Sequence, residues 1–316
     1  TPISPSRSTI ILISLLIGLL IPTLILTIRR LMDITVSGRH DVEEATTIPL
    51  VGELPTWEEG GDDGLITTCS SDAPIVEAFR MLRYGLNFMR HSAKVCVVTS
   101  STPGQGKSFI SRNLAAIMGM ANKRVLLVDA DIRKRTLSSK FGRSNGLTGW
   151  LVDEEEKLSL DEIIIKDGVA KQVDFLPAGM LPPNPSELLM SSRLEALVEE
   201  ARELYDFIII DTTPILAVSD ASIVDRVADV TLFVIRVGVQ VRAFLPELEK
   251  MNKDKKYRHL CIALNDVDVK AKYGYGYGYG YGNYSYGNYS YGYGGQHNNR
   301  QSKKKLSGRL LSKLRK

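Results

Sequence analysis

Six short apolar segments lie between residues 94 and 265, and they constrain the fold more than any other feature of the chain. They read KVCVVTS, RVLLVDAD, VDFLPAG, DFIIIDTTP, ADVTLFVIRVG and HLCIALN. Segments that are apolar at every position are typical of strands buried on both faces, as in parallel sheets covered by helices. Helical stretches begin near Lys107, Ser186, Ser219 and Phe244. We therefore expect an α/β fold with a doubly wound, mostly parallel sheet.

The first apolar segment leads into a glycine-containing loop that is typical of phosphate binding. Residues 100–108 read SSTPGQGKS and open a helix. Backbone N–H groups of such a loop and of a helix N-terminus can surround phosphate oxygens. We expect Lys107 to reach the β- and γ-phosphates and the Ser108 hydroxyl to bind Mg²⁺. Ser101 replaces the first glycine of the usual GxxxxGK[ST] pattern.

Carboxylates end two further apolar segments. VLLVDADIR supplies Asp129 and Asp131, with Arg133 beside them to balance charge, and FIIIDTTP supplies Asp211. Ligands of open α/β sheets bind outside the carboxyl ends of the strands. An Asp after a strand is often only a turn or capping residue, but three beside one phosphate loop favour a nucleotide site for ATP and Mg²⁺. The predicted Mg²⁺ contacts are Ser108, Asp131 and Asp211. The predicted nucleotide contacts are Pro103, Gly104, Gln105, Gly106, Lys107, Ser108, Phe109 and Arg133.

The N-terminal part of the chain contains one long uncharged segment, from Thr9 to Ile28. As a helix it is about 30 Å long, which is enough to cross a bilayer core. Arg29 and Arg30 follow at once, as at a cytoplasmic face, whereas a signal peptide has a shorter apolar region and a cleavage site. We expect a transmembrane helix within residues 1–31 and a cytoplasmic linker over residues 32–75.

Residues 269–295 contain ten tyrosines separated only by glycine, asparagine and serine. From Tyr273 to Tyr293 there is no aliphatic side chain to bury, so we expect a disordered tail. Residues 296–316 form a basic tail, which would be a solvated chain, an amphipathic helix on an anionic membrane surface, or a partner of phosphorylated tyrosines in the neighbouring tract. Its eight Lys and Arg residues exceed the net charge of +4. The rest of the chain is therefore net acidic, and no nucleic-acid partner is indicated.

Taken together, these motifs resemble the bacterial tyrosine kinases (BY-kinases) that are fused to polysaccharide co-polymerases. That family has a phosphate loop, an hhhDxDxR motif, present as LLVDADIR, and an hhhDxxP motif, present as IIIDTTP. It also has ExxRxxR, present at Glu77, Arg80 and Arg83, and a segment that matches PPNPSELL at residues 182–189. The resemblance covers nearly the whole chain. It implies a P-loop kinase domain over residues 76–268, and a first membrane span and a periplasmic domain before residue 1.

The resemblance implies a protein-tyrosine kinase that transfers the γ-phosphoryl group of ATP to its own tail, between subunits of an oligomer. Glu77, Arg80 and Arg83 would form the contact between neighbouring kinase domains in a ring. The catalytic residues would be Lys107, Asp129, Asp131 and Asp211. Asp129 is the candidate for accepting the phenol proton, because a phenol with a pKa near 10 benefits from a nearby carboxylate. The predicted phosphate acceptors are Tyr273, Tyr275, Tyr277, Tyr279, Tyr281, Tyr284, Tyr286, Tyr289, Tyr291 and Tyr293.

By the same resemblance, the chain regulates capsular or exopolysaccharide synthesis and export at the bacterial inner membrane, with its kinase domain in the cytoplasm. Its partners would be the polysaccharide export and polymerisation machinery and a tyrosine phosphatase. The alternative is a P-loop ATPase switch or scaffold of the partition or septum-placement type, without kinase activity. Those proteins carry a second lysine, in GKGGxGK, where this chain has Thr102. That position, the apolar N-terminal segment and the tyrosine tract favour the kinase.

Overall fold

The structure is a computed structural model, and it describes residues 7–32, 34–57, 64–66, 70, 73–90, 92–140, 145–153, 155 and 157–268. Eight strands form one sheet in the order β1-β8-β7-β2-β6-β3-β5-β4. Every neighbouring pair is parallel except β4 with β5. The strands are β1 (Leu50–Pro55), β2 (Val95–Ser100), β3 (Val125–Asp129), β4 (Ile165–Ala170), β5 (Val173–Leu176), β6 (Phe207–Asp211), β7 (Val230–Arg236) and β8 (Leu260–Val267). The predicted mostly parallel α/β sheet is therefore confirmed.

The two edge strands were not predicted. β1 lies in the segment that we expected to be a linker, and it pairs in parallel with β8. Leu54 is buried, but most other side chains of β1 are only partly buried and the strand contains Gly52 and Pro55, so it lacks the continuous apolar pattern of a central strand. β4 has no fully buried residue and joins the sheet antiparallel to β5. Residues 34–57 thus contribute one helix and one strand to the sheet domain.

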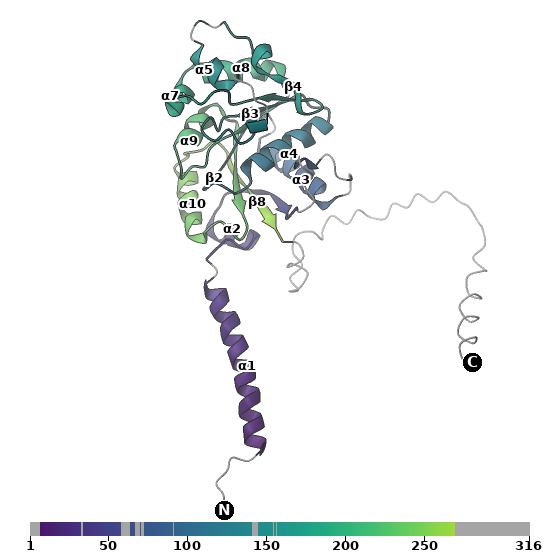
Figure 1. Cartoon of the computed structure of the whole chain (residues 1–316), viewed down its shortest axis with the longest axis vertical. Helices are drawn as coiled ribbons and strands as arrows, with labels where there is room; N and C mark the ends of the chain where they lie inside the picture. The colour runs from purple at the N-terminus through teal and green to yellow at the C-terminus, as the bar shows by residue number, and fades with distance from the viewer. Residues whose placement is uncertain are drawn as a thin grey trace, which may run out of the picture. The chain divides into compact units, whose positions relative to one another are not determined.

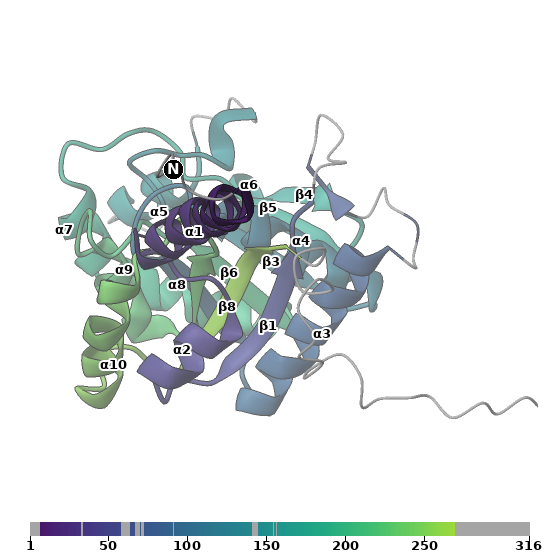
Figure 2. The same ribbon diagram turned by 90° about the horizontal axis from the view of Figure 1, so that it is seen from below.

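Helices cover both faces of the sheet. The helices are α1 (Arg7–Met32), α2 (Arg39–Ala45), α3 (Pro74–Met89), α4 (Lys107–Met120), α5 (Leu147–Val152), α6 (Leu160–Ile163), α7 (Pro185–Met190), α8 (Arg193–Leu204), α9 (Asp220–Val224) and α10 (Leu245–Lys253). Figures 1 and 2 show α3 and α4 on one side of the sheet and α9 and α10 on the other. Alternate residues of β2 serve the two faces, since Cys96 and Val98 pack with α3 and α4 whereas Val95 and Val97 pack with α8.

The uncharged N-terminal segment is helical, as predicted, and lies within α1. Its large apolar side chains from Ile10 to Ile25 are all exposed, each by about half or more. No helix formed by the described side chains is both long enough and apolar enough to span a membrane. The predictions for the tyrosine tract and the basic tail concern residues 269–316, which lie outside the described residues.

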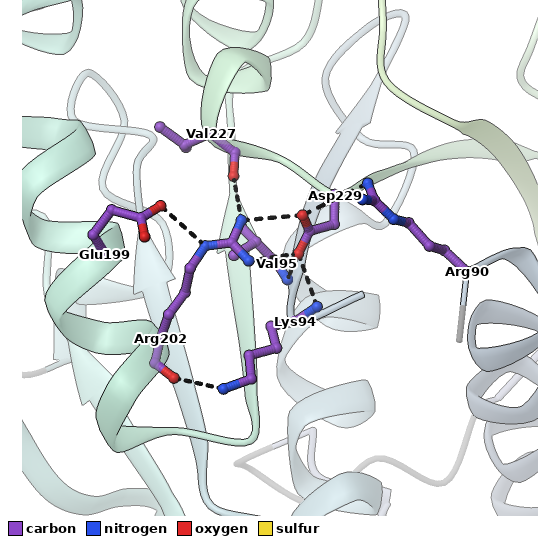
Figure 3. Close-up of polar contacts among 7 residues, drawn as sticks. All are labelled: Arg90, Lys94, Val95, Glu199, Arg202, Val227 and Asp229. Atoms are coloured by element: carbon purple, nitrogen blue, oxygen red, sulfur yellow. Dashed lines mark hydrogen bonds and ion pairs between the residues drawn. The ribbon is translucent and has the colours of Figure 1, made fainter. Parts of the chain in front are cut away.

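Asp229 ties three segments together at the amino end of the sheet (Figure 3). Its Oδ2 atom accepts the backbone N–H groups of Lys94 at 2.8 Å and Val95 at 2.9 Å, where β2 begins. The guanidinium of Arg202, from α8, donates to both carboxylate oxygens at 2.8 and 3.1 Å. The Lys94 ammonium in turn donates to the carbonyl of Arg202 at 2.7 Å. These contacts fix the start of β2 against α8 and the start of β7.

We predict that Asp229→Asn lowers the free energy of unfolding by about 3 kcal/mol at neutral pH, because the largely buried Arg202 guanidinium loses its buried carboxylate partner and keeps only the exposed Glu199. Burial alone would raise the pKa of Asp229, but Arg202 and the N–H groups of Val95 and Lys94 outweigh it and hold the pKa below its ordinary value. The charged form therefore stabilises the fold above about pH 4 and loses that effect as pH falls further. Urea unfolding at several pH values measures both effects.

The control is Glu199→Gln, because the Glu199 carboxylate also pairs with Arg202 but is 74% exposed. It should change the free energy of unfolding by less than about 0.5 kcal/mol. The difference in the free energy of unfolding between wild type and Asp229→Asn should become smaller below about pH 4. A gap that stays constant down to pH 3 would contradict the assignment.

Candidate functional site

The predicted phosphate loop connects β2 to α4. Gly104 and Gly106 have φ values of 83° and 94°, which glycine adopts without strain. Gly106 caps α4, whose first N–H groups have no partner within the helix. Ser101, which replaces the first glycine of the pattern, is fully buried and donates a hydrogen bond to Oε1 of Gln240. The loop thus leads into a helix N-terminus whose free N–H groups could bind an anion.

Side chains from β7 and β8 hold this loop in place. The Gln105 side chain is almost fully buried, and its Oε1 atom accepts the N–H of Arg236 at 2.6 Å. The Arg236 guanidinium donates to the carbonyl of Gly104 at 3.2 Å. The Asn265 amide donates to the carbonyl of Gln105 at 3.0 Å. Our sequence reasoning missed Arg236 and Asn265, although both lie at the carboxyl ends of predicted strands, where ligands bind.

Asp211 lies at the carboxyl end of β6 and accepts two hydroxyl groups from α4. Ser108 donates to Oδ2 at 2.6 Å, and Ser111 donates to Oδ1 at 3.0 Å. Burial raises the pKa of Asp211 to about 6, against the Ser108 hydroxyl, the Lys107 charge and the Ser111 hydroxyl, which lower it. The sequence analysis found Ser108 but missed Ser111, which lies one helical turn later on the same helix.

Asp129 is the fully buried last residue of β3, aligned with Asp211 across the β3–β6 pair. Its Oδ2 atom accepts the N–H of Ser138 at 2.9 Å and the Ser138 hydroxyl at 2.5 Å. Its Oδ1 atom accepts the N–H of Asp131 at 3.2 Å. Burial and the charge of Asp211 raise the pKa of Asp129 to about 7, against the Ser138 hydrogen bonds. Both oxygens thus accept hydrogen bonds within the chain, and Oδ1 accepts a single one.

Lys107 and Asp131 complete the charged cluster. Lys107 is 8% exposed, and burial lowers its pKa while the charges of Asp211 and Asp131 raise it. Asp131 is 5% exposed, and its Oδ1 atom accepts the N–H of Lys134 at 3.0 Å. Two buried carboxylates thus act on the buried ammonium group of Lys107, and a third, Asp129, is close enough to both of them to feel their charge. Such a cluster has an excess of negative charge that a divalent cation would compensate.

The oxygen ligands in this cluster fit Mg²⁺. Within the described part of the chain, no three acidic, histidine or cysteine side chains are arranged to hold a metal ion by themselves. Mg²⁺ usually binds through one or two carboxylates, with the remaining ligands from water and substrate phosphates. Ser108 and Asp211, whose side-chain oxygens are 2.6 Å apart, offer such a partial ligand set.

The other predicted residues lie around this centre. Pro103 is exposed in the phosphate loop, and Phe109 packs against the rings of Trp57 and Phe79 at centroid distances of 5.7 and 5.8 Å. Phe109 also lines a cavity of about 150 Å³ next to the loop, together with Pro55, Thr56, Trp57, Arg236, Asn265 and Asp266. Arg133 does not point its hydrogen-bond donors at the acidic cluster, since it contacts Ser186 and Asp220 instead.

The ExxRxxR residues lie on α3, away from the phosphate loop. Arg80 pairs with Glu77 at 3.1 Å, and the Glu77 carboxylate is 57% exposed. Arg83 donates to the carbonyl of Ile117 at 3.3 Å, and its guanidinium lies 5.0 Å from the centre of the Tyr84 ring. Arg83 is therefore tied to α4 of its own chain, whereas Glu77 presents its carboxylate at the surface.

We predict that Gly106→Ala weakens binding of Mg²⁺–ADP at least tenfold. An added Cβ would lie 2.1 Å from Nδ2 of Asn265, and the residue would keep a positive φ, which together cost roughly 1–3 kcal/mol. Gly104→Ala is the matched control, because it also has a positive φ but has no heavy atom within 4 Å of its added Cβ. Titration with fluorescent ADP compares the two variants. Equal losses would show that the contact with Asn265 does not matter.

Comparison with known proteins agrees with this geometry. Residues 93–253 match the AAA domain family. The chain is 34% identical over 275 residues to the putative tyrosine-protein kinase EpsB of Ralstonia solanacearum. The aligned region covers 80% of this chain and 36% of that protein. It is 40% identical over 168 residues to the tyrosine-protein kinase etk of Escherichia coli K12. Here the aligned region covers 52% of this chain and 23% of that protein. The chain thus spans about a third of the length of EpsB.

Two solved structures are similar over nearly their whole length. The kinase domain of the Escherichia coli tyrosine kinase ETK is 31% identical with a TM-score of 0.64, over 76% of this chain and 98% of that domain. The BceF tyrosine kinase domain is 31% identical with a TM-score of 0.65, over 74% of this chain and 99% of that domain. The chain therefore belongs to the bacterial tyrosine-protein kinase family, and its residues 93–253 form an AAA domain.

Proposed function

We propose that this chain is a protein-tyrosine kinase that transfers the γ-phosphoryl group of ATP to tyrosine hydroxyls. One observation carries the proposal: Lys107, Ser108 and Asp211 lie together at the carboxyl ends of the central strands. The chain that holds them covers 98% of the ETK kinase domain. The two acidic motifs and the phosphate loop supply the charges that phosphoryl transfer needs, since this reaction depends mainly on positioning and charge neutralisation.

Each group has a distinct role in this mechanism. Lys107 and the loop N–H groups would hold the β- and γ-phosphates. Ser108, Asp131 and Asp211 would hold Mg²⁺ directly or through water, and the bound ion would neutralise the charge on the phosphates. Ser111 donates to Oδ1 of Asp211 and would keep that carboxylate in orientation if the Ser108 hydroxyl bound the ion.

The cavity beside the loop would receive part of the nucleoside. Phe109 offers an aromatic surface there, and the Asn265 amide and the Asp266 carboxylate offer polar atoms. Asp266 is held by Arg236, whose Nε atom lies 2.8 Å from Oδ2 of Asp266. Arg236 also binds the phosphate loop through Gly104, so one side chain links the two parts of the nucleotide site.

The acceptors would be the ten tyrosines from Tyr273 to Tyr293, phosphorylated between subunits of a ring. Glu77 and Arg80 on α3 support such a contact because both are partly exposed on one helix face. Arg83 would contribute by fixing α3 against α4. A chain of this kind would act with the polysaccharide export and polymerisation machinery and with a tyrosine phosphatase, to regulate capsular or exopolysaccharide synthesis.

The kinase is tested by incubating the chain with Mg²⁺–ATP and measuring intact mass and phosphopeptides. Several phosphates should appear on residues 273–293, and Lys107→Met should abolish them by removing the charge that holds the phosphates. Lys123→Met, at an exposed lysine after α4, is the control and should leave the number of phosphates unchanged. Continued ATP hydrolysis with unmodified tyrosines would refute the kinase and favour the ATPase switch or scaffold.

The whole uncharged segment of residues 9–28, which includes positions whose side chains are not described, would anchor the chain in the bacterial inner membrane, with the kinase domain on the cytoplasmic side. Residues 9–28 carry no charge, and the apolar side chains from Ile10 to Ile25 are exposed.

We predict that the double variant Ile17→Arg, Leu20→Arg loses its association with lipid vesicles in flotation experiments. Each arginine at the bilayer centre costs about 2.5–3.5 kcal/mol. Met120→Arg, at an exposed apolar residue of α4, is the control and should float like wild type. Flotation of the double variant with the vesicles would exclude α1 as the anchor.

A further inference from the structure

Asp220 is a fully buried carboxylate that the mechanism above does not use. It begins α9, and its Oδ2 atom accepts Nε of Arg133 at 2.7 Å. Its Oδ1 atom accepts the Ser186 hydroxyl at 2.7 Å and Nη2 of Arg133 at 3.3 Å. Nη2 of Arg133 also contacts the Ser186 hydroxyl oxygen at 2.8 Å. The three side chains therefore form a closed network, in which each one contacts both others.

The network joins segments that follow three different strands. Arg133 follows β3, Ser186 lies in α7 after β5, and Asp220 begins α9 after β6. These strands are neighbours, in the order β6-β3-β5. α7 and α9 lie side by side in both views of the chain (Figures 1 and 2). The contacts thus bridge the carboxyl ends of three adjacent strands, at the edge of the sheet that carries the acidic cluster.

This placement ties the position of Asp131 to Arg133. The two residues are separated only by Ile132, which is fully buried. The turn that contains them is closed by the N–H of Arg135, which donates to the carbonyl of Asp131 at 2.7 Å, and by the contact of Lys134 with the Asp131 carboxylate. In such a tight turn, a shift of the Arg133 backbone moves Asp131 with it. The anchor of Arg133 therefore sets where the Asp131 carboxylate lies.

We propose that Arg133, Ser186 and Asp220 are positioning residues that hold the Asp131 turn in the geometry required for Mg²⁺–nucleotide binding. The inference rests on the proposed function, because it assumes that Asp131 contacts the ion or its water. In this proposal Arg133 holds Asp131, which would bind the ion, and does not itself contact the nucleotide. It also gives a role to the PPNPSELL segment, which delivers Ser186 to the network.

The chain offers a matched control at the amino ends of the strands, opposite the nucleotide site. Arg202 also makes a forked contact with a largely buried carboxylate, that of Asp229 (Figure 3). A lysine at either position keeps the charge but loses the forked donors. Arg133→Lys and Arg202→Lys should therefore both lower the melting temperature. Only Arg133→Lys should disturb the nucleotide site.

The experiment titrates MgCl₂ against the full chain with fluorescent methylanthraniloyl-ADP, and records the melting temperature of each variant. Mutating a residue that supports a metal ligand typically lowers metal affinity by about 10–100-fold. Arg133→Lys and Asp220→Asn should therefore raise the half-maximal Mg²⁺ concentration roughly tenfold. Ser186→Ala removes one hydroxyl with little effect on folding, and it should raise that concentration about threefold, while Ser186→Thr restores it. Arg202→Lys should leave it unchanged.

The outcomes separate this proposal from the proposed function. Wild-type Mg²⁺ dependence in Ser186→Ala and Arg133→Lys, with a lowered melting temperature, would mean a purely structural role and would overturn the inference. A wild-type chain that binds Mg²⁺–ADP but never phosphorylates tyrosine would refute the kinase and leave the network intact. A wild-type chain that binds no Mg²⁺–ADP would overturn both.

Discussion

The parallel pairing of β6 with both β2 and β3 is the constraint on which the rest of the site depends. Asp211 lies opposite Val98 of β2 on one side and opposite Asp129 of β3 on the other. Because the strands are parallel and in register, the phosphate loop after β2 and the acidic turn after β3 leave the sheet beside Asp211. A shift by one residue would turn these side chains to the opposite face of the sheet.

This arrangement concentrates negative charge where little water can reach it. Burial raises the pKa values of Asp129 and Asp211, and Lys107 is the ammonium group buried with them. Hydroxyl and backbone N–H groups from Ser108, Ser111 and Ser138 relieve part of the cost of burial. A divalent cation would offset the remaining negative charge, and this links the site's electrostatics to the binding of a metal–nucleotide complex.

Similar ion pairs lie at the amino and carboxyl ends of the strands, but they have different consequences. At the amino edge, the Arg202–Asp229 contact joins the starts of β2 and β7 to α8 and stabilises the fold. At the carboxyl edge, the Arg133–Asp220 contact lies two residues from Asp131 and orders the turn that carries it. The physical interaction is the same in both places, namely an arginine fork on a largely buried carboxylate. Its consequence depends on which segment it restrains.

The sequence by itself determined the six central strands, the helical form of residues 9–28, and the residue types of the phosphate loop and the acidic turns. Those features are local, because buried strands require continuous apolar runs and a phosphate loop requires particular residues at fixed spacing. Only the tertiary structure decided the edge strands β1 and β4, the support of Gln105 by Arg236 and Asn265, and the partners of Arg133. The side-chain contacts among these join residues 53 to 160 positions apart, and strand order rather than local pattern brings those residues together.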